Sequence, residues 1–395
     1  MNICKHFGSC GGCVYLDTPY HEELAQKELT LRETLSSYGG LLEGMLPAPS
    51  PQGYRNKMEL AFGDEGKDGQ LALGIRKRRS YYEVATVEDC ELIPEDFKQI
   101  ALCAQKYFRN SGDAFFHRKR HTGSLRHLVL RRGEFTGEIL INISATSGLE
   151  TDLEPLMAQL LALKLDGQIV GILRSTNDGV ADAVKDEHVS TLWGRNYFNE
   201  RICGLDFTVS AFSFFQTNSA GAEVLYGVVK DMATQIPAKL AYDLYCGTGT
   251  IALVLSPNHE KVIGIELNPA AIEAAKKNSK LNSITNCEFF AGDVQAMLQE
   301  KTNNTETQQN NQQSNPDIVV VDPPRDGLHP KTLAKLITLA PPRLVYVSCK
   351  PTSLARDAAI LAEAGYKPIR VMGVDMFPRT PHVETVALLT KIKTL

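Results

Sequence analysis

The chain has 395 residues, of which 43% are hydrophobic and 22% are charged, enough for a sizeable core and two or three domains. Its net charge of -4 gives no global basic signature, so any contact with nucleic acid must come from a local patch. Nine cysteines, without an apolar leader or a long apolar run, favour a cytoplasmic protein with metal-binding or catalytic thiols over a disulfide framework.

Four cysteines in the first quarter of the chain could bind a metal. Cys4, Cys10 and Cys13 lie in CKHFGSCGGC, and Cys90 in VEDCELIP is a candidate fourth ligand. Four thiolates are enough for a [4Fe–4S] cluster or for a structural zinc ion, and the spacing does not distinguish between the two.

Residues 53–209 contain short apolar runs separated by turn residues, which predict a smaller antiparallel domain. Two arginine-rich stretches in this region could bind phosphates, and their aromatic residues could stack on unpaired bases. An ordinary solvated surface is the alternative. The first stretch contains Arg76, Lys77, Arg78, Arg79, Tyr81 and Tyr82, and the second contains Arg118, Lys119, Arg120, Arg126, Arg131 and Arg132.

The chain changes character near residue 210. From Leu240 onward, short β-branched runs alternate with helical patterns, which predicts βαβ units and a parallel sheet with helices on both faces. Residues 383–390 predict one more strand, which we expect to be an antiparallel edge strand. The polar tract 302–315 cannot form a core, and we expect it to be a flexible insert.

The stretch DLYCGTGTIAL places a glycine turn containing Gly247 between a strand and a helix, where backbone N–H groups can approach a ligand. Glu266 ends the next strand, where a carboxylate can accept hydrogen bonds from ribose hydroxyls. Asp293 could reach an adenine amino group. Ala252 stands where a dinucleotide fingerprint has its third glycine, so S-adenosylmethionine is favoured over a dinucleotide. An ordinary strand-to-helix turn is the alternative.

Asp322 in VVVDPPRDGL and Cys349 in VYVSCKPTSLARD follow buried strands, at the sheet edge where ligands bind in open α/β folds. Arg325 stands where methylases of exocyclic amino groups have an aromatic residue, which counts against amine methylation. Pro351 suits the first turn of a helix, and a thiol near a helix N-terminus is stabilised as the nucleophilic thiolate. Cys349 could instead be a packed residue at a strand end, but its place just past the strand favours a nucleophile.

A nucleophilic cysteine beside a methyl donor predicts one chemistry. C5 of a pyrimidine becomes nucleophilic when a thiolate adds to C6, and it can then attack a sulfonium methyl group. A base must afterwards take the proton from C5. Glu384 is the predicted base and His382 the fallback, because an antiparallel final strand would begin beside Cys349.

Five motifs together, FFQTN, DLYCGTG, VDPPRDGL, SCKPTSLARD and HVET, resemble the RNA 5-methyluridine (uracil-C5) methyltransferase family over nearly the whole chain. The resemblance implies an α/β protein with a Rossmann-like class I S-adenosylmethionine-dependent domain and a smaller β-rich central domain carrying an iron–sulfur site. It implies Cys349 as nucleophile and Glu384 as base. The residues implied to contact the methyl donor are Gln216, Tyr245, Glu266 and Asp322.

The cysteine spacing C-x5-C-x2-C with a distant C-x-x-I-P is similar to that of cluster-bearing members that methylate 23S rRNA, which implies a [4Fe–4S] cluster here. Longer members begin with an extra β-barrel, whereas Cys4 is almost the first residue of this chain, as in the shorter 23S rRNA branch. The resemblance also implies discontinuous domains. One would combine 1–15 with 49–210, holding the cluster and contacting RNA, and the catalytic one would combine 16–48, a helical pattern, with 211–395.

We therefore expect a cytoplasmic monomer that methylates RNA, with 23S rRNA as substrate and neither DNA nor a membrane as partner. A target uridine flipped out of a hairpin loop could pack near Phe214 or Phe215. Two alternatives are the same chemistry on the tRNA T-loop and a non-catalytic iron–sulfur protein that binds RNA. The set of Cys349, Glu384 and Asp322 speaks against the second.

Overall fold

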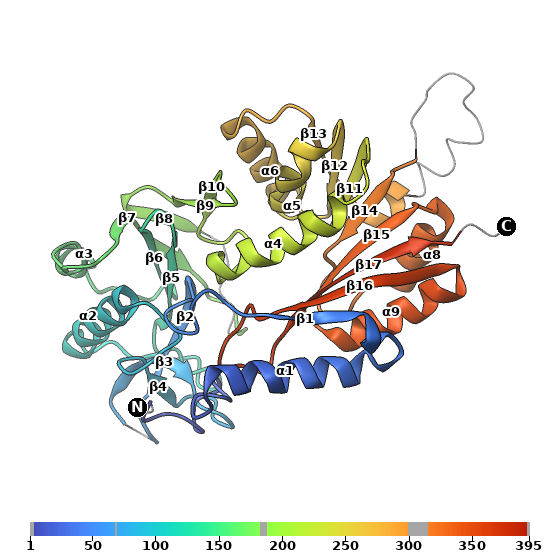
Figure 1. Cartoon of the computed structure of the whole chain (residues 1–395). Coiled ribbons are helices and arrows are strands. Elements are labelled where there is room, and N and C mark those ends of the chain that lie inside the picture. Colours follow the sequence, from blue (N-terminus) through green and yellow to red (C-terminus); the bar gives the residue numbers. More distant parts are fainter. Residues whose placement is uncertain (1–3, 68, 182–187, 299–314, 393–395) are drawn as a thin grey trace.

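The computed structural model describes residues 4–67, 69–181, 188–298 and 315–392. An eight-stranded and a seven-stranded sheet build two lobes that lie side by side, and helix α1 (Tyr20–Thr34) runs below strand β1 (Leu42–Leu46) of the eight-stranded sheet (Figure 1). The expected insert at 302–315 lies outside the described residues except for its last residue.

The eight-stranded sheet carries the βαβ units expected from the alternating pattern. Its strand order is β1-β16-β17-β15-β14-β11-β12-β13, and the five strands from β15 to β13 run parallel to one another. The bounds are β1 (Leu42–Leu46), β11 (Leu240–Leu244), β12 (Lys261–Glu266), β13 (Cys287–Ala291), β14 (Ile318–Val321), β15 (Arg343–Ser348), β16 (Tyr366–Val374) and β17 (Glu384–Lys391).

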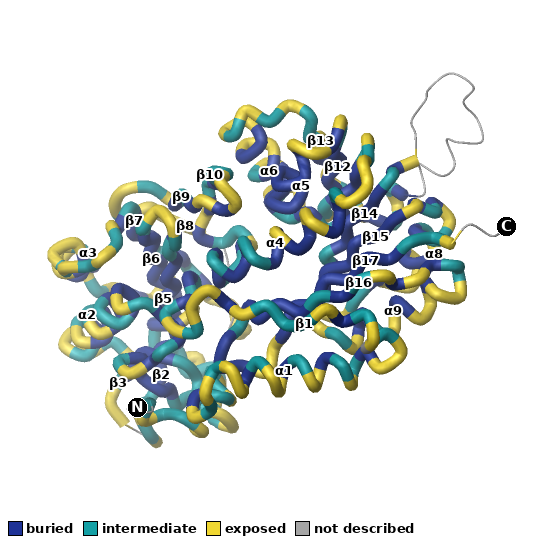
Figure 2. The backbone as a smooth tube through the Cα atoms, in the orientation of Figure 1, coloured by how far each residue is buried: buried dark blue, intermediate teal, exposed yellow. Residues whose placement is uncertain are grey.

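Helices cover both faces of this sheet, so its central strands are apolar on both sides. In β14 all four residues are buried: Val320 faces the core shared with α4, α5 and α6, whereas Val319 and Val321 face the core shared with α1, α8 and α9. Figure 2 shows this continuous burial along the strands. The bounds are α1 (Tyr20–Thr34), α4 (Ser219–Thr234), α5 (Thr250–Leu255), α6 (Pro269–Leu281), α8 (Pro330–Leu339) and α9 (Pro351–Glu363), with 3-10 turns η1 (Ser36–Leu41) and η2 (Ser256–Asn258).

Two expectations about this sheet are wrong. The final strand β17 is antiparallel, as expected, but it is not at an edge, because β16 pairs with its other side. The stretch 16–48 is not helical throughout, since β1 follows α1 and pairs in parallel with β16. Both differences have one cause. The strand β16 pairs with β1 and with β17, which come from distant parts of the chain, and a local sequence pattern cannot predict such pairing.

The seven-stranded sheet has the order β4-β3-β2-β5-β6-β7-β8. All its strand pairs are antiparallel except β6–β7, which is parallel because α3 connects the two strands as a crossover. The expectation of a purely antiparallel domain is therefore wrong for this pair. The bounds are β2 (Lys57–Asp64), β3 (Leu71–Arg76), β4 (Val84–Thr86), α2 (Glu95–Ser111), β5 (Leu125–Arg132), β6 (Glu138–Ala145), α3 (Glu154–Leu161), β7 (Gln168–Thr176) and β8 (Val189–Gly194), followed by the hairpin β9 (Tyr197–Ile202) and β10 (Leu205–Ser210).

The N-terminal segment crosses from one lobe to the other. Cys10 bridges to Lys77 beside the seven-stranded sheet, whereas Leu31 of α1 packs in the core of the eight-stranded sheet. On this basis we propose two discontinuous domains, with 16–48 joining 211–395 and the flanking 1–15 joining 49–210.

Candidate active site

One large cavity lies at the carboxyl ends of β11, β12, β14 and β15. Its volume of about 1070 Å³ exceeds the size of most single-ligand pockets, so it has room for two ligands side by side. All the residues that the sequence singled out for methyl-donor binding or catalysis line it, namely Gln216, Tyr245, Gly247, Glu266, Asp293, Asp322, Cys349 and Glu384.

The glycine turn after β11 forms one wall of the cavity. Tyr245 and Gly247 both adopt left-handed backbone conformations, with φ of 64° and 52°. The Gly247 N–H donates to Oε2 of Glu266 at 3.3 Å, and the Asn268 N–H donates to Oε1 at 2.9 Å. These two bonds fix the Glu266 carboxylate at the wall, and each of its oxygens keeps a further lone pair with which to accept from a ligand.

The stretch FFQTN forms a second wall. Gln216 is half-buried and hydrogen-bonds the buried Tyr226. Phe214 is 74% exposed at the cavity and Phe215 only 5%. Of these two aromatic side chains, therefore, only Phe214 presents a face on which a base could stack.

Asn218 is a residue of this stretch that the sequence reasoning missed. Its Oδ1 accepts the Gly221 N–H at 2.9 Å and caps α4, while its Nδ2 donates to the Met376 carbonyl at 2.9 Å. An asparagine directly before a helix is a readable cap signal, but the bond to Met376 is visible only in the fold.

Cys349 follows β15 and precedes Lys350, the N-cap residue of α9. We expected the helix terminus to favour its thiolate, and this expectation is wrong. Burial, followed by the charges of Glu384 and Asp322, raises the pKa of the Cys349 thiol, and a backbone hydrogen bond and the charge of Arg325 oppose them only in part. Cys349 lies one residue before the N-cap of α9, and two carboxyl groups act on its thiol.

Glu384 is the first residue of β17, and it is 6% exposed. Ser348 pairs with Thr385 in the antiparallel ladder, so Cys349 and Glu384, each one residue further on, come next to each other at its end. Burial, and then the charge of Asp322, raises the pKa of Glu384 to about 8. Burial also raises the pKa of Asp322 to about 6. A carboxyl group that titrates near neutral pH is suited to general acid–base chemistry.

His382 lines the same cavity. Burial, and then the charge of Arg325, lowers its pKa, which favours the neutral imidazole. Its ring meets that of Phe377 edge-on at 6.3 Å. Both candidate bases are thus in the cavity.

Helix α9 holds the loop that follows Asp322, a function of SLARD that the sequence reasoning missed. Ser353 Oγ donates to the Arg325 carbonyl at 3.0 Å, and Asp357 Oδ2 accepts the Leu328 N–H at 2.8 Å. Gly327, with φ of 79°, leaves no room for a side chain, because a Cβ there would lie 2.7 Å from Asp357 Oδ2. The spacing of Ser353 and Asp357 by four residues places both on one helix face and could have suggested a shared contact.

The second arginine-rich stretch is partly structural rather than an RNA-binding surface. Arg131 is 2% exposed and donates to the carbonyls of Ser210 at 2.8 Å, Ala211 at 3.1 Å and Ser213 at 2.6 Å, which shapes the segment leading into the cavity. Arg126 is equally buried and donates to the Ala181 carbonyl at 3.1 Å.

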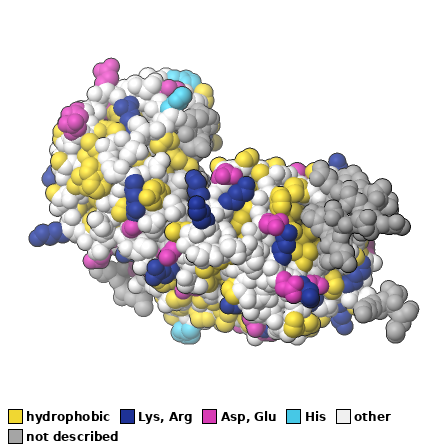
Figure 3. All heavy atoms as spheres, turned by 90° about the horizontal axis from the view of Figure 1, so that it is seen from above, with side chains coloured by type: hydrophobic (Ala, Val, Ile, Leu, Met, Phe, Trp, Pro, Cys, Tyr) yellow, Lys and Arg dark blue, Asp and Glu magenta, His cyan; other side chains and the backbone are white. Residues whose placement is uncertain are grey.

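Other residues of the two basic stretches are accessible and close together. Arg78, Arg79, Lys119 and Arg120 are exposed, and Tyr82 of the first stretch stacks on His117 beside the second, with ring centroids 4.2 Å apart. On the face in Figure 3, basic side chains are spread over both lobes among acidic ones and form no single large patch.

Cys4, Cys10, Cys13 and Cys90 line one small cavity of about 30 Å³. Burial, followed by the nearby Cys90, Cys10 and Cys4, raises the pKa of Cys13 to about 12. Among the described residues, no group of three or more His, Cys, Asp or Glu side chains converges in a way that could hold a single metal ion. The four thiols are thus neighbours, but the structure does not show the expected iron–sulfur site.

Within the described ranges, no helix is long and apolar enough to span a membrane.

Comparisons with known proteins identify the family of the chain. The family model described as tRNA (Uracil-5-)-methyltransferase matches residues 145–392. The chain is 40% identical over 398 residues to an uncharacterized RNA methyltransferase of Clostridium tetani, covering 99% of this chain and 84% of that protein. It is 43% identical over 391 residues to an uncharacterized RNA methyltransferase of Clostridium acetobutylicum, covering 98% of this chain and 83% of that protein.

Among solved structures, the chain is similar to the crystal structure of Pyrococcus abyssi tRNA (uracil-54, C5)-methyltransferase in complex with S-adenosyl-L-homocysteine. The TM-score is 0.77 and the identity 28%, over 97% of this chain and 86% of that one. The similarity therefore extends over both lobes.

Proposed function

The chain belongs to the tRNA (uracil-5-)-methyltransferase family, and from this we propose that it forms 5-methyluridine in RNA, with Cys349 as nucleophile and Glu384 as base. The observation that carries the proposal is the place of these two side chains. They are neighbours at the end of the β15–β17 ladder, in the cavity that also contains Glu266 and the glycine turn.

The proposed reaction begins when the Cys349 thiolate bonds to C6 of the uracil, and the electron pair of the C5–C6 bond moves toward C5 and the C4 carbonyl oxygen. C5 would then bond to the methyl carbon of the donor while the bond between that carbon and the sulfonium sulfur breaks, and S-adenosylhomocysteine would leave as the product. Bound S-adenosylmethionine would supply this electrophilic methyl group, and its sulfonium charge would favour the thiolate. Glu384 takes the C5 proton, the C5–C6 double bond returns, and Cys349 leaves as thiolate.

The donor set around the glycine turn fits S-adenosylmethionine. We propose that Glu266 accepts hydrogen bonds from the ribose hydroxyls and that Asp293, exposed at the cavity, accepts from the adenine amino group. Gln216, Tyr245 and Asp322 would contact the rest of the donor near Cys349. The cavity volume of about 1070 Å³ supports simultaneous binding of the donor and a flipped uridine.

We also propose that Cys4, Cys10, Cys13 and Cys90 bind a [4Fe–4S] cluster. The support is an all-sulfur set around one cavity, together with the resemblance to cluster-bearing members. A zinc ion needs its four ligands at about 2.3 Å from a single point, whereas each thiolate of a cluster binds its own iron atom. The four thiols could supply either set of ligands, and the resemblance to cluster-bearing members is what favours the cluster.

The proposed substrate is 23S rRNA, because the spacing of the cysteines resembles that of the branch that methylates this RNA. Transfer RNA is the second candidate, since the similar protein of Pyrococcus abyssi is a tRNA (uracil-54, C5)-methyltransferase. The chemistry would be the same on either RNA.

The proposed chemistry is tested by releasing tritium from RNA labelled at C5 of uracil. Methyl transfer to C5 displaces this hydrogen, so at least one tritium should enter the water for each methyl group transferred. Methyl transfer without tritium release would overturn C5 as the target.

A further inference from the structure

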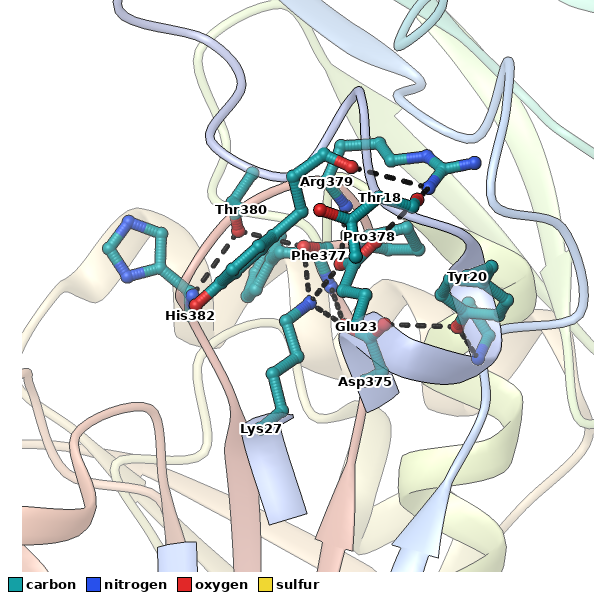
Figure 4. A network of polar contacts seen from close by, with 12 residues as sticks. Thr18, Tyr20, Glu23, Lys27, Asp375, Phe377, Pro378, Arg379, Thr380 and His382 are labelled. Atoms are coloured by element: carbon teal, nitrogen blue, oxygen red, sulfur yellow. Dashed lines mark hydrogen bonds and ion pairs between the residues drawn. The ribbon is translucent and has the colours of Figure 1, made fainter. Parts of the chain in front are cut away.

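The loop between β16 and β17, residues 375–383, leads directly into Glu384 and carries His382 (Figure 4). Side chains from three distant parts of the chain bind its backbone. The bonds run from Asn218 Nδ2 to the Met376 carbonyl at 2.9 Å, from Lys27 Nζ to the Phe377 carbonyl at 3.2 Å, and from the Tyr54 hydroxyl to the Pro378 carbonyl at 3.0 Å. The loop is therefore tied to helices α1 and α4 and to the chain before β2.

Arg379 binds the N-terminal part of the chain through both its backbone and its guanidinium group. Its N–H donates to Glu23 Oε1 at 2.7 Å, and its carbonyl accepts the N–H groups of Val14 at 2.7 Å and Tyr15 at 3.2 Å. Its guanidinium donates to the Thr18 carbonyl at 2.9 Å and pairs with Glu23 Oε2 at 3.3 Å. Val14 follows Cys13, which lines the small cavity with the other three cysteines. The loop is therefore hydrogen-bonded to the chain segment that forms this cavity.

The conformation and burial of Arg379 indicate that its position is strictly determined. Its φ of 67° lies in the left-handed region, which non-glycine residues occupy when the surrounding structure imposes it. Arg379 is 7% exposed, and Glu23, Lys27 and Asp375 are at most 2% exposed. Lys27 binds Glu23 at 2.6 Å and Asp375 at 2.8 Å, so two cations face two carboxylates in one buried network (Figure 4).

We propose that Arg379 is a positioning residue, which holds Glu384 and His382 in place against Cys349 by fixing the loop to the N-terminal segment. The role in catalysis rests on the function proposed above. Small displacements of a catalytic group are costly, since about 1 Å can lower a rate by about 100-fold.

The test is the variant Arg379→Met, with Arg343→Met as the matched control. In Arg379→Met the Glu23 carboxylate keeps Lys27 as its partner. Arg343 is also buried and its Nη1 donates to the Ile236 carbonyl at 2.8 Å, but it lies at the opposite end of β15 from Cys349. Arg379→Lys tests for rescue by the retained positive charge.

Two readouts separate positioning from general stability. We expect Arg379→Met to lower kcat for tritium release by about 10- to 100-fold, to leave the Kd for S-adenosylmethionine within about twofold, and to recover in part in Arg379→Lys. The second readout is the pH profile of Cys349 alkylation by iodoacetamide, followed on its own peptide. It should move to lower pH, because a displaced Glu384 no longer adds to the effect of burial and of Asp322, which raise the thiol pKa.

An unchanged alkylation profile, or an equal effect in Arg343→Met, would overturn the positioning role. Wild-type protein that releases no tritium would refute the proposed function instead, and the alkylation comparison, which needs no RNA, would still decide the role of Arg379.

If Arg379→Met does not fold, a milder pair of variants tests whether fixing this loop positions the catalytic residues. Tyr54→Phe removes one hydroxyl that donates to the loop carbonyl of Pro378 at 3.0 Å. Tyr366→Phe removes the same kind of bond, to the Pro341 carbonyl at 2.9 Å, far from the cavity. Only Tyr54→Phe should lower kcat, by about 3- to 10-fold, which is the value of one hydrogen bond. Equal kcat in the two variants would refute the proposal.

Discussion

Cys349 and Glu384 are neighbours at the end of the β15–β17 ladder, one residue beyond the pair of Ser348 and Thr385. Both groups resist ionisation: burial and then the charge of Glu384 raise the pKa of Cys349, while burial and then the charge of Asp322 raise the pKa of Glu384 to about 8. The thiol and the carboxyl group therefore do not readily carry negative charges at the same time. This suits a reaction in two stages, in which the Cys349 thiolate attacks first and the Glu384 carboxylate takes a proton later.

Replacing Cys349 by alanine should lower methyl transfer by about 10⁴-fold or more, the scale on which loss of a nucleophile acts. Binding of S-adenosylmethionine should persist, because the glycine turn and Glu266 are untouched. Isothermal titration calorimetry and methyl incorporation measure the two effects. Cys203→Ala, at the exposed cysteine between β9 and β10, is the control. Methylation of RNA by the Cys349→Ala variant would refute the role of Cys349 as nucleophile.

In the Glu384→Gln variant, Cys349 should still add to the target uracil, but the base is missing. Turnover should therefore fall by about 10²- to 10⁴-fold. A covalent protein–RNA adduct should accumulate, because the thiolate leaves only after the C5 proton is removed. Denaturing gel electrophoresis detects this adduct. Slow turnover without an adduct would indicate that Glu384 acts before methyl transfer.

Glu384 should also make stability depend on pH. Its pKa rises from 4.5 to about 8 on folding, so the folded protein retains a proton that the unfolded chain loses in this window. The resulting stabilisation is complete below pH 4.5 and is lost as the pH rises through about 8. Glu384→Gln, which cannot ionise, should therefore be more stable than wild type at high pH, by an amount on the order of a few kcal/mol. Thermal melts at both ends of the window test this, and an equal difference at both ends would contradict it.

Glu266→Ala should weaken S-adenosylmethionine binding by about 10-fold or more, because hydrogen bonds to a charged acceptor contribute about 1.5–3 kcal/mol. Glu288→Ala on neighbouring β13 is the control, since Glu288 lies at the surface and forms an ion pair with Lys261 at 2.8 Å. Calorimetric titration measures both dissociation constants. If the two variants bind S-adenosylmethionine equally well, Glu266 does not contact the donor.

Anaerobically purified protein should contain about four iron and four sulfide per chain if the cysteine cavity holds a [4Fe–4S] cluster. Cys13→Ser should lose most of this iron, whereas Cys103→Ser, on α2 and outside the cavity, should keep it. Elemental analysis also measures zinc, and one zinc without iron would overturn the cluster.

Local sequence patterns were enough to predict which strand ends meet at the cavity. The stretch around Asp322 and the one around Cys349 each show a buried strand that stops at a polar residue, and parallel strands bring such ends together. The parts that were wrong depend on distant contacts. The interior place of β17 depends on β16, and the burial of Arg131 depends on carbonyls some 80 residues away. The lowered pKa expected for Cys349 is wrong because burial, and then the charges of Glu384 and Asp322 from other strands, raise it.

The most direct test of the central claim is to incubate the protein with labelled S-adenosylmethionine and, separately, 23S rRNA and bulk tRNA from cells lacking its gene. Nuclease digestion and mass spectrometry then locate the label. The predicted result is 5-methyluridine at one position of the 23S rRNA. Label in tRNA would keep the chemistry and contradict the substrate, whereas 5-methyluridine in neither RNA, with the cluster intact, would contradict the account itself.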